Sequence, residues 1–302
     1  MTGGDRPVRV GVVGAGPWSG LIHAPMFANH PRTTLAGVWA RRPGAAEEVA
    51  SPYGAPGFSS FDALLDRCDA LSFAVPPDVQ ADMAATAARA GKALLLEKPL
   101  ALGVGPAEQL VDAIDRAGVP NQLDLTWRYA DGVRSFLRDV DAAVPVGGRA
   151  RFITDAYLGS VFATPWRLEH GPLLDVGPHL IDLLEAALGT VVGIRAHGDP
   201  HRWIGLLLEH DGGLASEVSI SAYAPVGAGR SGEVAPIRAG AEVYTSGGAV
   251  EVDTSDVFDA TTVTRIVDEF VATVEHRSPH RLDAHHGLHL QRLLATAVAD
   301  IG

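Results

Sequence analysis

The first 125 residues alternate regularly between short β-rich runs and Ala-rich stretches with helical spacing. The β-rich runs are Val8–Val13, Thr34–Trp39, Ala70–Val75, Ala93–Leu96 and Gln122–Leu125. The helical stretches between them are Leu21–Asn29, Ala45–Ala50, Phe61–Arg67, Val79–Ala90 and Ala107–Ala117. This strand–helix repeat predicts an α/β fold with a doubly wound parallel sheet, because parallel neighbours need crossover helices. The runs show little polar alternation, which is typical of strands buried on both faces.

Residues after about 125 follow a different pattern. Helices are expected at Val133–Val140, Leu173–Leu188, Thr262–Glu275 and His285–Ala299. Strands are expected at Arg149–Tyr157, Thr190–His197, Trp203–Glu209, Leu214–Ala222, Ala241–Thr245 and Val250–Asp253, with a Gly/Pro/Ser-rich loop at Ala224–Ala239. The turns Asp211-Gly212-Gly213 and Ser246-Gly247-Gly248 favour antiparallel hairpins. We therefore predict a doubly wound α/β domain over residues 1–125 and an α+β domain with a mostly antiparallel sheet over residues 126–302.

The charge balance excludes several classes of partner. Lys plus Arg number 24 and Asp plus Glu number 36, so the formal net charge is −12. This argues against nucleic acid and anionic membrane surfaces as partners, because a protein that binds either needs a basic face. The single cysteine, Cys68, excludes an intrachain disulfide and favours a reducing compartment. Without a signal peptide or a long apolar run, the sequence predicts a soluble cytoplasmic protein.

A glycine-rich loop follows the first predicted strand. Gly14 permits a tight turn, and Gly16 lets the backbone approach a pyrophosphate held by the amides of the following helix. Pro17 and Trp18 continue this loop, and Ser19 stands at the third small position of the fingerprint. The motif predicts dinucleotide binding because a strand precedes it and a helix follows it. The alternative is a glycine-rich turn without a ligand.

The end of the second strand indicates which dinucleotide is preferred. A carboxylate at this position would bind the ribose 2′-hydroxyl of NAD, but the sequence has Arg41 and Arg42 there. Guanidinium groups can pair with a 2′-phosphate. We therefore expect NADP(H) to be preferred, with NAD(H) possible. The alternative is a solvated surface pair of arginines.

Two further motifs carry groups suited to hydride-transfer chemistry. Lys98 follows the fourth long strand in Glu97-Lys98-Pro99, at the strand end where ligands bind in doubly wound sheets. Asp175 precedes His179 by one helical turn, and Pro178 suits the first turn of a helix. A histidine is a natural acid/base near neutral pH, and a lysine can stabilise a developing alkoxide. The alternative for His179 is a packing or capping role.

These motifs resemble the glucose–fructose oxidoreductase/inositol dehydrogenase/rhizopine-catabolism (Gfo/Idh/MocA) family of NAD(P)-dependent oxidoreductases. The resemblance covers the whole chain and implies a Rossmann domain followed by a substrate-binding domain whose open sheet is used for dimers or tetramers. It implies Lys98, Asp175 and His179 as the catalytic set, with Asp175 and His179 also touching substrate. Other positions matching the family near cofactor are Pro76 and Glu97, and those near substrate are Arg128, Tyr129, Trp166 and Arg167. Gln80 stands where the family commonly has histidine.

The sequence therefore predicts an NADP(H)-dependent oxidoreductase acting on a polyhydroxylated substrate: a sugar, a ketosugar or a cyclitol. The alternatives are a reductase of a non-sugar carbonyl, imine or enone, and a dinucleotide-binding sensor without turnover. No metal is predicted. His285 and His289 have i, i+4 spacing, but no further ligand at a recognised spacing accompanies them.

Overall fold

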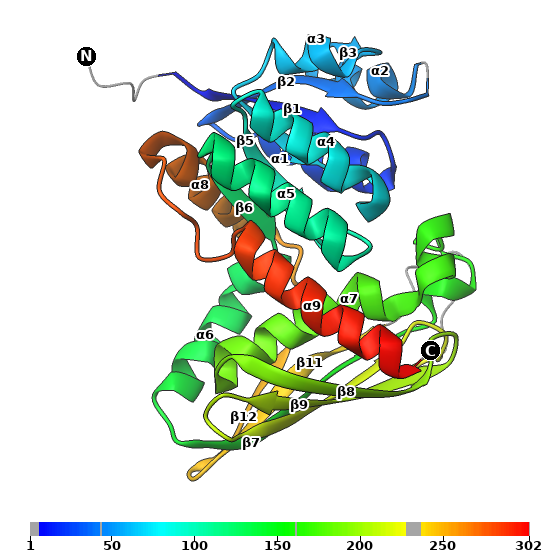
Figure 1. The fold of residues 1–302 in the computed structure, drawn as a ribbon, viewed down its shortest axis with the longest axis vertical. Coiled ribbons are helices and arrows are strands. Elements are labelled where there is room, and N and C mark those ends of the chain that lie inside the picture. The colour runs from blue at the N-terminus through cyan, green and yellow to red at the C-terminus, as the bar shows by residue number, and fades with distance from the viewer. Residues whose placement is uncertain (1–5, 43, 161, 228–236, 302) are drawn as a thin grey trace. The chain divides into compact units, whose positions relative to one another are not determined.

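The computed structural model describes residues 6–42, 44–160, 162–227 and 237–301 and contains two compact units (Figure 1). The first unit comprises Met1–Asp124 and Val263–His289, and the second comprises Leu125–Thr262 and Leu290–Gly302. The sequence-based division assigned residues 126–302 to one domain, whereas 263–289 group with the first unit. Local pattern could not reveal this, because the grouping depends on tertiary packing.

The first unit is built on a six-stranded sheet in which every pair of neighbours is parallel. Its strands are β1 (Val8–Val13), β2 (Thr33–Trp39), β3 (Gly57–Phe58), β4 (Ala70–Phe73), β5 (Ala93–Glu97) and β6 (Asn121–Asp124). Their spatial order is β3-β2-β1-β4-β5-β6, which is the Rossmann order. The sequence analysis missed β3, because two residues are too few to produce a periodic signal.

Helices connect these strands, and the last segment of the unit adds one more. They are η1 (Ser19–His23), α1 (Ala24–Ala28), α2 (Ala45–Ala50), η2 (Ser51–Tyr53), α3 (Phe61–Leu65), α4 (Pro77–Arg89), α5 (Val104–Ala117) and α8 (Ala260–His276), which belongs to this unit from Val263 onward. The predicted helix at Leu21–Asn29 is instead a π-helical turn, η1, followed by α1. Figure 1 shows α4 and α5 side by side along the sheet.

Residues far apart in the sequence complete the core of this unit. Phe27 of α1 and Phe270 of α8 are fully buried, and their rings meet edge to face at 6.2 Å. Gln122 of β6 donates a hydrogen bond to the Ile266 carbonyl at 3.2 Å. Burial of this apolar surface explains why α8 belongs with the Rossmann sheet.

The second unit contains a six-stranded mixed sheet. Its elements are η3 (Thr126–Tyr129), α6 (Asp131–Asp141), β7 (Pro145–Ile153), η4 (Ala156–Leu158), α7 (Pro165–Leu188), β8 (Val191–Asp199), β9 (Trp203–His210), β10 (Ala215–Ser221), β11 (Arg238–Thr245) and β12 (Gly248–Asp253). The order is β12-β11-β7-β10-β9-β8, with β7 and β10 parallel and the other pairs antiparallel. Helix α9 (Ala284–Ile301) starts in the first unit, and its residues from Leu290 belong to the second.

The predicted hairpin turns lie where they were expected, between β9 and β10 and between β11 and β12. Most of the predicted loop at Ala224–Ala239 lies outside the described residues, and its end, Arg238–Ala239, belongs to β11. Helix α7 packs on β7, β9, β10 and β11, so it covers the sheet. Within the described residues, no helix combines the length and the apolar character needed to cross a bilayer.

Candidate active site

The glycine loop after β1 has the geometry that a pyrophosphate-binding turn requires. Gly14 has a φ of +117°, and a Cβ atom there would lie 2.3 Å from the Ala74 carbonyl oxygen. A Cβ on Gly16 would meet nothing within 4 Å, and Gly16 and Pro17 are exposed. The buried Ser19 hydroxyl donates to the Gly14 carbonyl at 2.7 Å. Serine at the third fingerprint position therefore closes the turn with a hydrogen bond.

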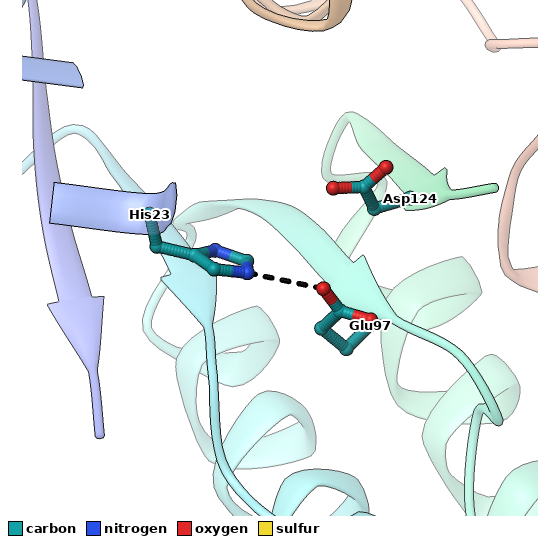
Figure 2. Close-up of side chains that lie close together, drawn as sticks. All are labelled: His23, Glu97 and Asp124. Atoms are coloured by element: carbon teal, nitrogen blue, oxygen red, sulfur yellow. Dashed lines mark hydrogen bonds and ion pairs between the residues drawn. The ribbon is translucent and has the colours of Figure 1, made fainter. Parts of the chain in front are cut away.

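A partly buried chain of hydrogen bonds connects this loop to the end of β5. Trp18 Nε1 donates to Glu97 Oε1 at 2.8 Å, and His23 Nε2 lies 3.0 Å from the same oxygen. The other ring nitrogen of His23, Nδ1, lies 2.7 Å from Ser72 Oγ of β4. Figure 2 shows the His23–Glu97 contact with the Asp124 carboxylate nearby. The three potential ligand atoms of His23, Glu97 and Asp124 lie within 4.8 Å of one another.

Gln80 of α4 holds the backbone of the same segment. Its side-chain oxygen accepts from the Glu97 amide at 2.8 Å, and its Nε2 donates to the Glu97 carbonyl at 2.7 Å. The same Nε2 lies 3.2 Å from the Leu100 carbonyl. Gln80 is 1% exposed. The side-chain amide therefore offers a donor and an acceptor at once, so that Gln80 holds both polar groups of the Glu97 backbone.

The other predicted cofactor residues lie at the same edge of the sheet. Arg41 and Arg42 follow β2, Pro76 is the N-cap residue of α4 after β4, and Lys98 follows β5. Because all strands of this sheet are parallel, their carboxyl ends share one edge. Both arginines are exposed, and no ion pair involves them within the described part of the chain.

Helix α7 carries the second predicted group of residues. Gly171 interrupts it with φ +74° and ψ 174°, so a new helical segment begins at Pro172. Pro178 therefore lies inside this segment. The sequence had suggested that it lies in the first turn of a helix, which is wrong. Asp175 and His179 both lie in this helical segment, one turn apart, and therefore share a face of the helix.

Asp175 is the centre of a buried polar cluster. Its Oδ2 accepts from the Tyr157 hydroxyl and from Arg167 Nε, both at 2.8 Å. Burial raises the pKa of the Tyr157 phenol, and the charge of Asp175 raises it further, so the hydroxyl stays protonated and donates. The Arg167 guanidinium also lies 4.9 Å from the Trp166 ring centroid, a cation–π distance. Both donors stabilise Asp175 as a carboxylate.

His179 stacks on an aromatic side chain. Its ring lies 5.0 Å from that of Trp127, with 12° between the planes, and the residue is 6% exposed. Asp182, three residues further along the helix, accepts from Arg128 Nη1 at 2.8 Å. Tyr129 is wholly buried, so its phenol supports the core of the unit. Of the predicted substrate residues, Arg167 and Asp175 contact one another directly.

The predicted residues thus form two groups. Gly14, Gly16, Trp18, Glu97 and Lys98 lie in the first unit, whereas Asp175 and His179 lie in the second with the predicted substrate residues. Convergence of Lys98 with Asp175 and His179 stays a prediction.

Near the C-terminus, His285 Nε2 contacts Asp115 at 3.0 Å, and His280 Nε2 contacts Glu269 at 3.1 Å.

Sequence reasoning missed His23, Ser72, Asp124, Trp127 and Tyr157. None of them belongs to a recognised sequence motif, and their contacts reach residues as far as 74 positions away. The one available signal was polarity inside otherwise apolar elements, as for Ser72 in β4 and His23 before α1.

The first unit fits a nicotinamide dinucleotide. The open space at Gly16 and the tight turn at Gly14, just before the first helical segment, form a cradle for a pyrophosphate. Fold and loop together define the class of the protein, a Rossmann-fold dinucleotide-binding protein. The family model described as "Oxidoreductase family, NAD-binding Rossmann fold" (GFO_IDH_MocA) matches residues 8–124. Over these residues the chain is similar to the Gfo/Idh/MocA family, and the chain is an oxidoreductase.

Relatives and solved structures agree with this assignment. A dTDP-3,4-didehydro-2,6-dideoxy-α-D-glucose 3-reductase from Streptomyces violaceoruber is 28% identical over 80% of this chain and 69% of its own length. D-xylose 1-dehydrogenase (NADP⁺) 2 from Haloferax volcanii is 26% identical over 94% of each chain. The crystal structure of the WlbA dehydrogenase from Bordetella pertussis, in complex with NADH and UDP-GlcNAcA, has a TM-score of 0.84 at 21% identity, covering 98% and 96% of the chains. The structural likeness extends the shared fold to both units.

Proposed function

We propose that this protein is an NADP(H)-dependent oxidoreductase that transfers a hydride between the nicotinamide and a carbinol or carbonyl carbon of a sugar, ketosugar or cyclitol. The observation that carries the proposal is the 2.8 Å hydrogen bond between Trp18 and Glu97. It joins the nucleotide loop to the segment bearing Lys98, so the loop and this lysine occupy one edge of the sheet. Three similar proteins are named as enzymes of sugars: the two above and D-apiose dehydrogenase of Paraburkholderia graminis.

Each residue has a defined role in this proposal. The bound dinucleotide would supply or accept the hydride, held through Gly14 and Gly16. His179 moves the proton at the substrate oxygen, and Lys98 donates a hydrogen bond to the same oxygen and stabilises its developing charge. Asp175, held by Tyr157 and Arg167, keeps a negative charge one turn from His179. That charge favours the protonated imidazole when it forms.

The substrate class is tested by turnover. Ketosugars, aldoses, cyclitols and nucleotide-linked sugars are incubated with NADPH, NADH and their oxidised forms, and nicotinamide absorbance is followed. We expect turnover of at least one polyhydroxylated compound and none of matched non-sugar ketones, imines and enones. Turnover confined to the non-sugar compounds would overturn the proposed substrate class.

Cofactor preference gives the next prediction. Arg41→Ala should weaken NADPH binding while changing NADH binding little, because NADH lacks the 2′-phosphate. A charge-assisted bond of this kind contributes about 1.5–3 kcal/mol, so about 10- to 100-fold weaker NADPH binding is expected. Titration of both cofactors into both proteins measures this. Arg89→Ala, an exposed arginine in the last turn of α4, is the matched control. Equal losses for both cofactors would contradict the 2′-phosphate role.

Assembly gives a further prediction. The outward face of the second sheet carries large apolar side chains, including Trp203 at 48% and Leu207 at 46% exposed. An open sheet face of this kind needs cover, and we propose a second copy of the chain. Sedimentation velocity at micromolar concentration should give a mass above the 31.6 kDa of one chain. Trp203→Glu should shift the species toward the monomer, whereas Tyr53→Glu, on η2, should not. A monomeric wild type would refute the proposal.

A further inference from the structure

The peptide plane between Glu97 and Lys98 is held at both of its polar ends. The Glu97 carbonyl accepts from Gln80 Nε2 at 2.7 Å. The Lys98 amide, on the other side of the same plane, donates to Glu97 Oε2 at 3.2 Å. A peptide unit fixed at both ends cannot rotate freely, so the direction in which the chain leaves toward the Lys98 Cα is fixed as well.

The Glu97 carboxylate is itself held by groups from the nucleotide loop. Trp18 Nε1 and His23 Nε2 both contact Oε1, while Oε2 accepts a hydrogen bond from the Lys98 amide. Three N–H donors therefore converge on one side chain that only accepts. Ser72 contacts the other nitrogen of the His23 ring, whose side chain is fully buried. The ring consequently has a fixed orientation toward Glu97.

We infer that Glu97 is a positioning residue that connects the nucleotide loop to Lys98. Trp18 and His23 orient the carboxylate, and the carboxylate orients the Lys98 amide. Gln80 fixes the opposite end of the same peptide plane. The inference rests on the proposed function only in taking Lys98 as the residue that acts on substrate. It assigns to Glu97 no contact with the reacting atoms.

Glu97→Gln tests the connection with almost no change in volume. A glutamine side chain carries one acceptor and one NH₂ group, so it cannot accept from all three donors. At least one N–H group among Trp18, His23 and Lys98 then loses its acceptor. The matched control is Glu275→Gln. Glu275 accepts from Arg32 at 2.7 Å at the start of β2, the opposite edge of the same sheet.

A first readout needs neither substrate nor cofactor. The sequence contains two lysines, Lys92 and Lys98, so ¹⁵N-lysine labelling gives two backbone amide signals. Glu97→Gln and Trp18→Phe should both shift the Lys98 signal and leave that of Lys92 in place. Glu275→Gln should shift neither. An unmoved Lys98 signal in Trp18→Phe would overturn the connection, because the hydrogen bonds join Trp18 to Lys98 through Glu97.

A second readout separates positioning from general damage. On the panel compound with the highest turnover, Glu97→Gln should lower kcat by about 10²-fold, the scale of a misplaced catalytic group. In a Lys98→Met background, Glu97→Gln should lower kcat by no more than about a further twofold. An equal loss in both backgrounds would indicate a structural role and refute the inference. A Lys98→Met enzyme with full turnover would instead refute the role of Lys98 in the proposed function.

Discussion

His179→Ala is expected to lower kcat by about 10²–10⁴-fold, the usual contribution of a general acid or base. The dissociation constant for NADPH should hardly change, because the glycine loop proposed to hold the phosphates lies in the other unit. A loss in kcat with unchanged cofactor affinity identifies an interaction made in the transition state. Stopped-flow turnover and fluorescence titration of NADPH measure the two quantities.

Loss of the ring also removes the stack on Trp127, which contributes about 1 kcal/mol to stability. His179→Gln therefore accompanies the alanine variant, because it keeps volume and polarity but cannot exchange a proton near neutral pH. Both variants should fold and both should be nearly inactive. His276→Ala, at the exposed end of α8, is the matched control and should keep full activity. Full turnover in His179→Gln would exclude the proton-transfer role.

The second large effect is expected at Lys98. Lys98→Ala should lower kcat by about 10²–10³-fold, the measured scale for removing one donor to a developing oxyanion. The KM of the sugar should change less, because the stabilised charge develops mainly in the transition state. Steady-state kinetics on the best panel compound give both parameters.

The chain provides an internal control for this prediction. Lys92 lies just before the start of β5 and Lys98 just after its end, so the two lysines mark opposite ends of one strand. Lys92 Nζ donates to the Cys68 carbonyl at 3.0 Å. Lys92→Ala should leave kcat intact and lower stability slightly, by about 1 kcal/mol for the lost hydrogen bond. Similar losses of kcat in both variants would point to global damage and contradict the assigned role of Lys98.

The sequence predicted five of the six strands of the Rossmann sheet, all except β3, because the signals of these strands are local. A strand buried on both sides reads as a short apolar run, and a surface helix reads as Ala-rich spacing of about 3.6 residues. The glycine loop was equally visible, since a tight turn and a close backbone approach both demand glycine. The prediction of the helix after the loop was wrong in detail, because a π-helical turn at Ser19–His23 has no simple periodic signature.

Tertiary structure alone decided which residues surround the motifs. Helix α8 packs on the Rossmann sheet because Phe270 and Phe27 bury one another, although the chain pattern placed it in the second domain. Trp18, His23 and Glu97 share hydrogen bonds over 74 to 79 positions of sequence. Periodicity reports which face of an element is buried, whereas a hydrogen bond depends on which distant partner folding brings to that face. For that reason the sequence by itself determined most of the elements and the glycine loop, and it predicted the chemistry of Lys98 and His179. Only the tertiary structure decided which residues contact these groups.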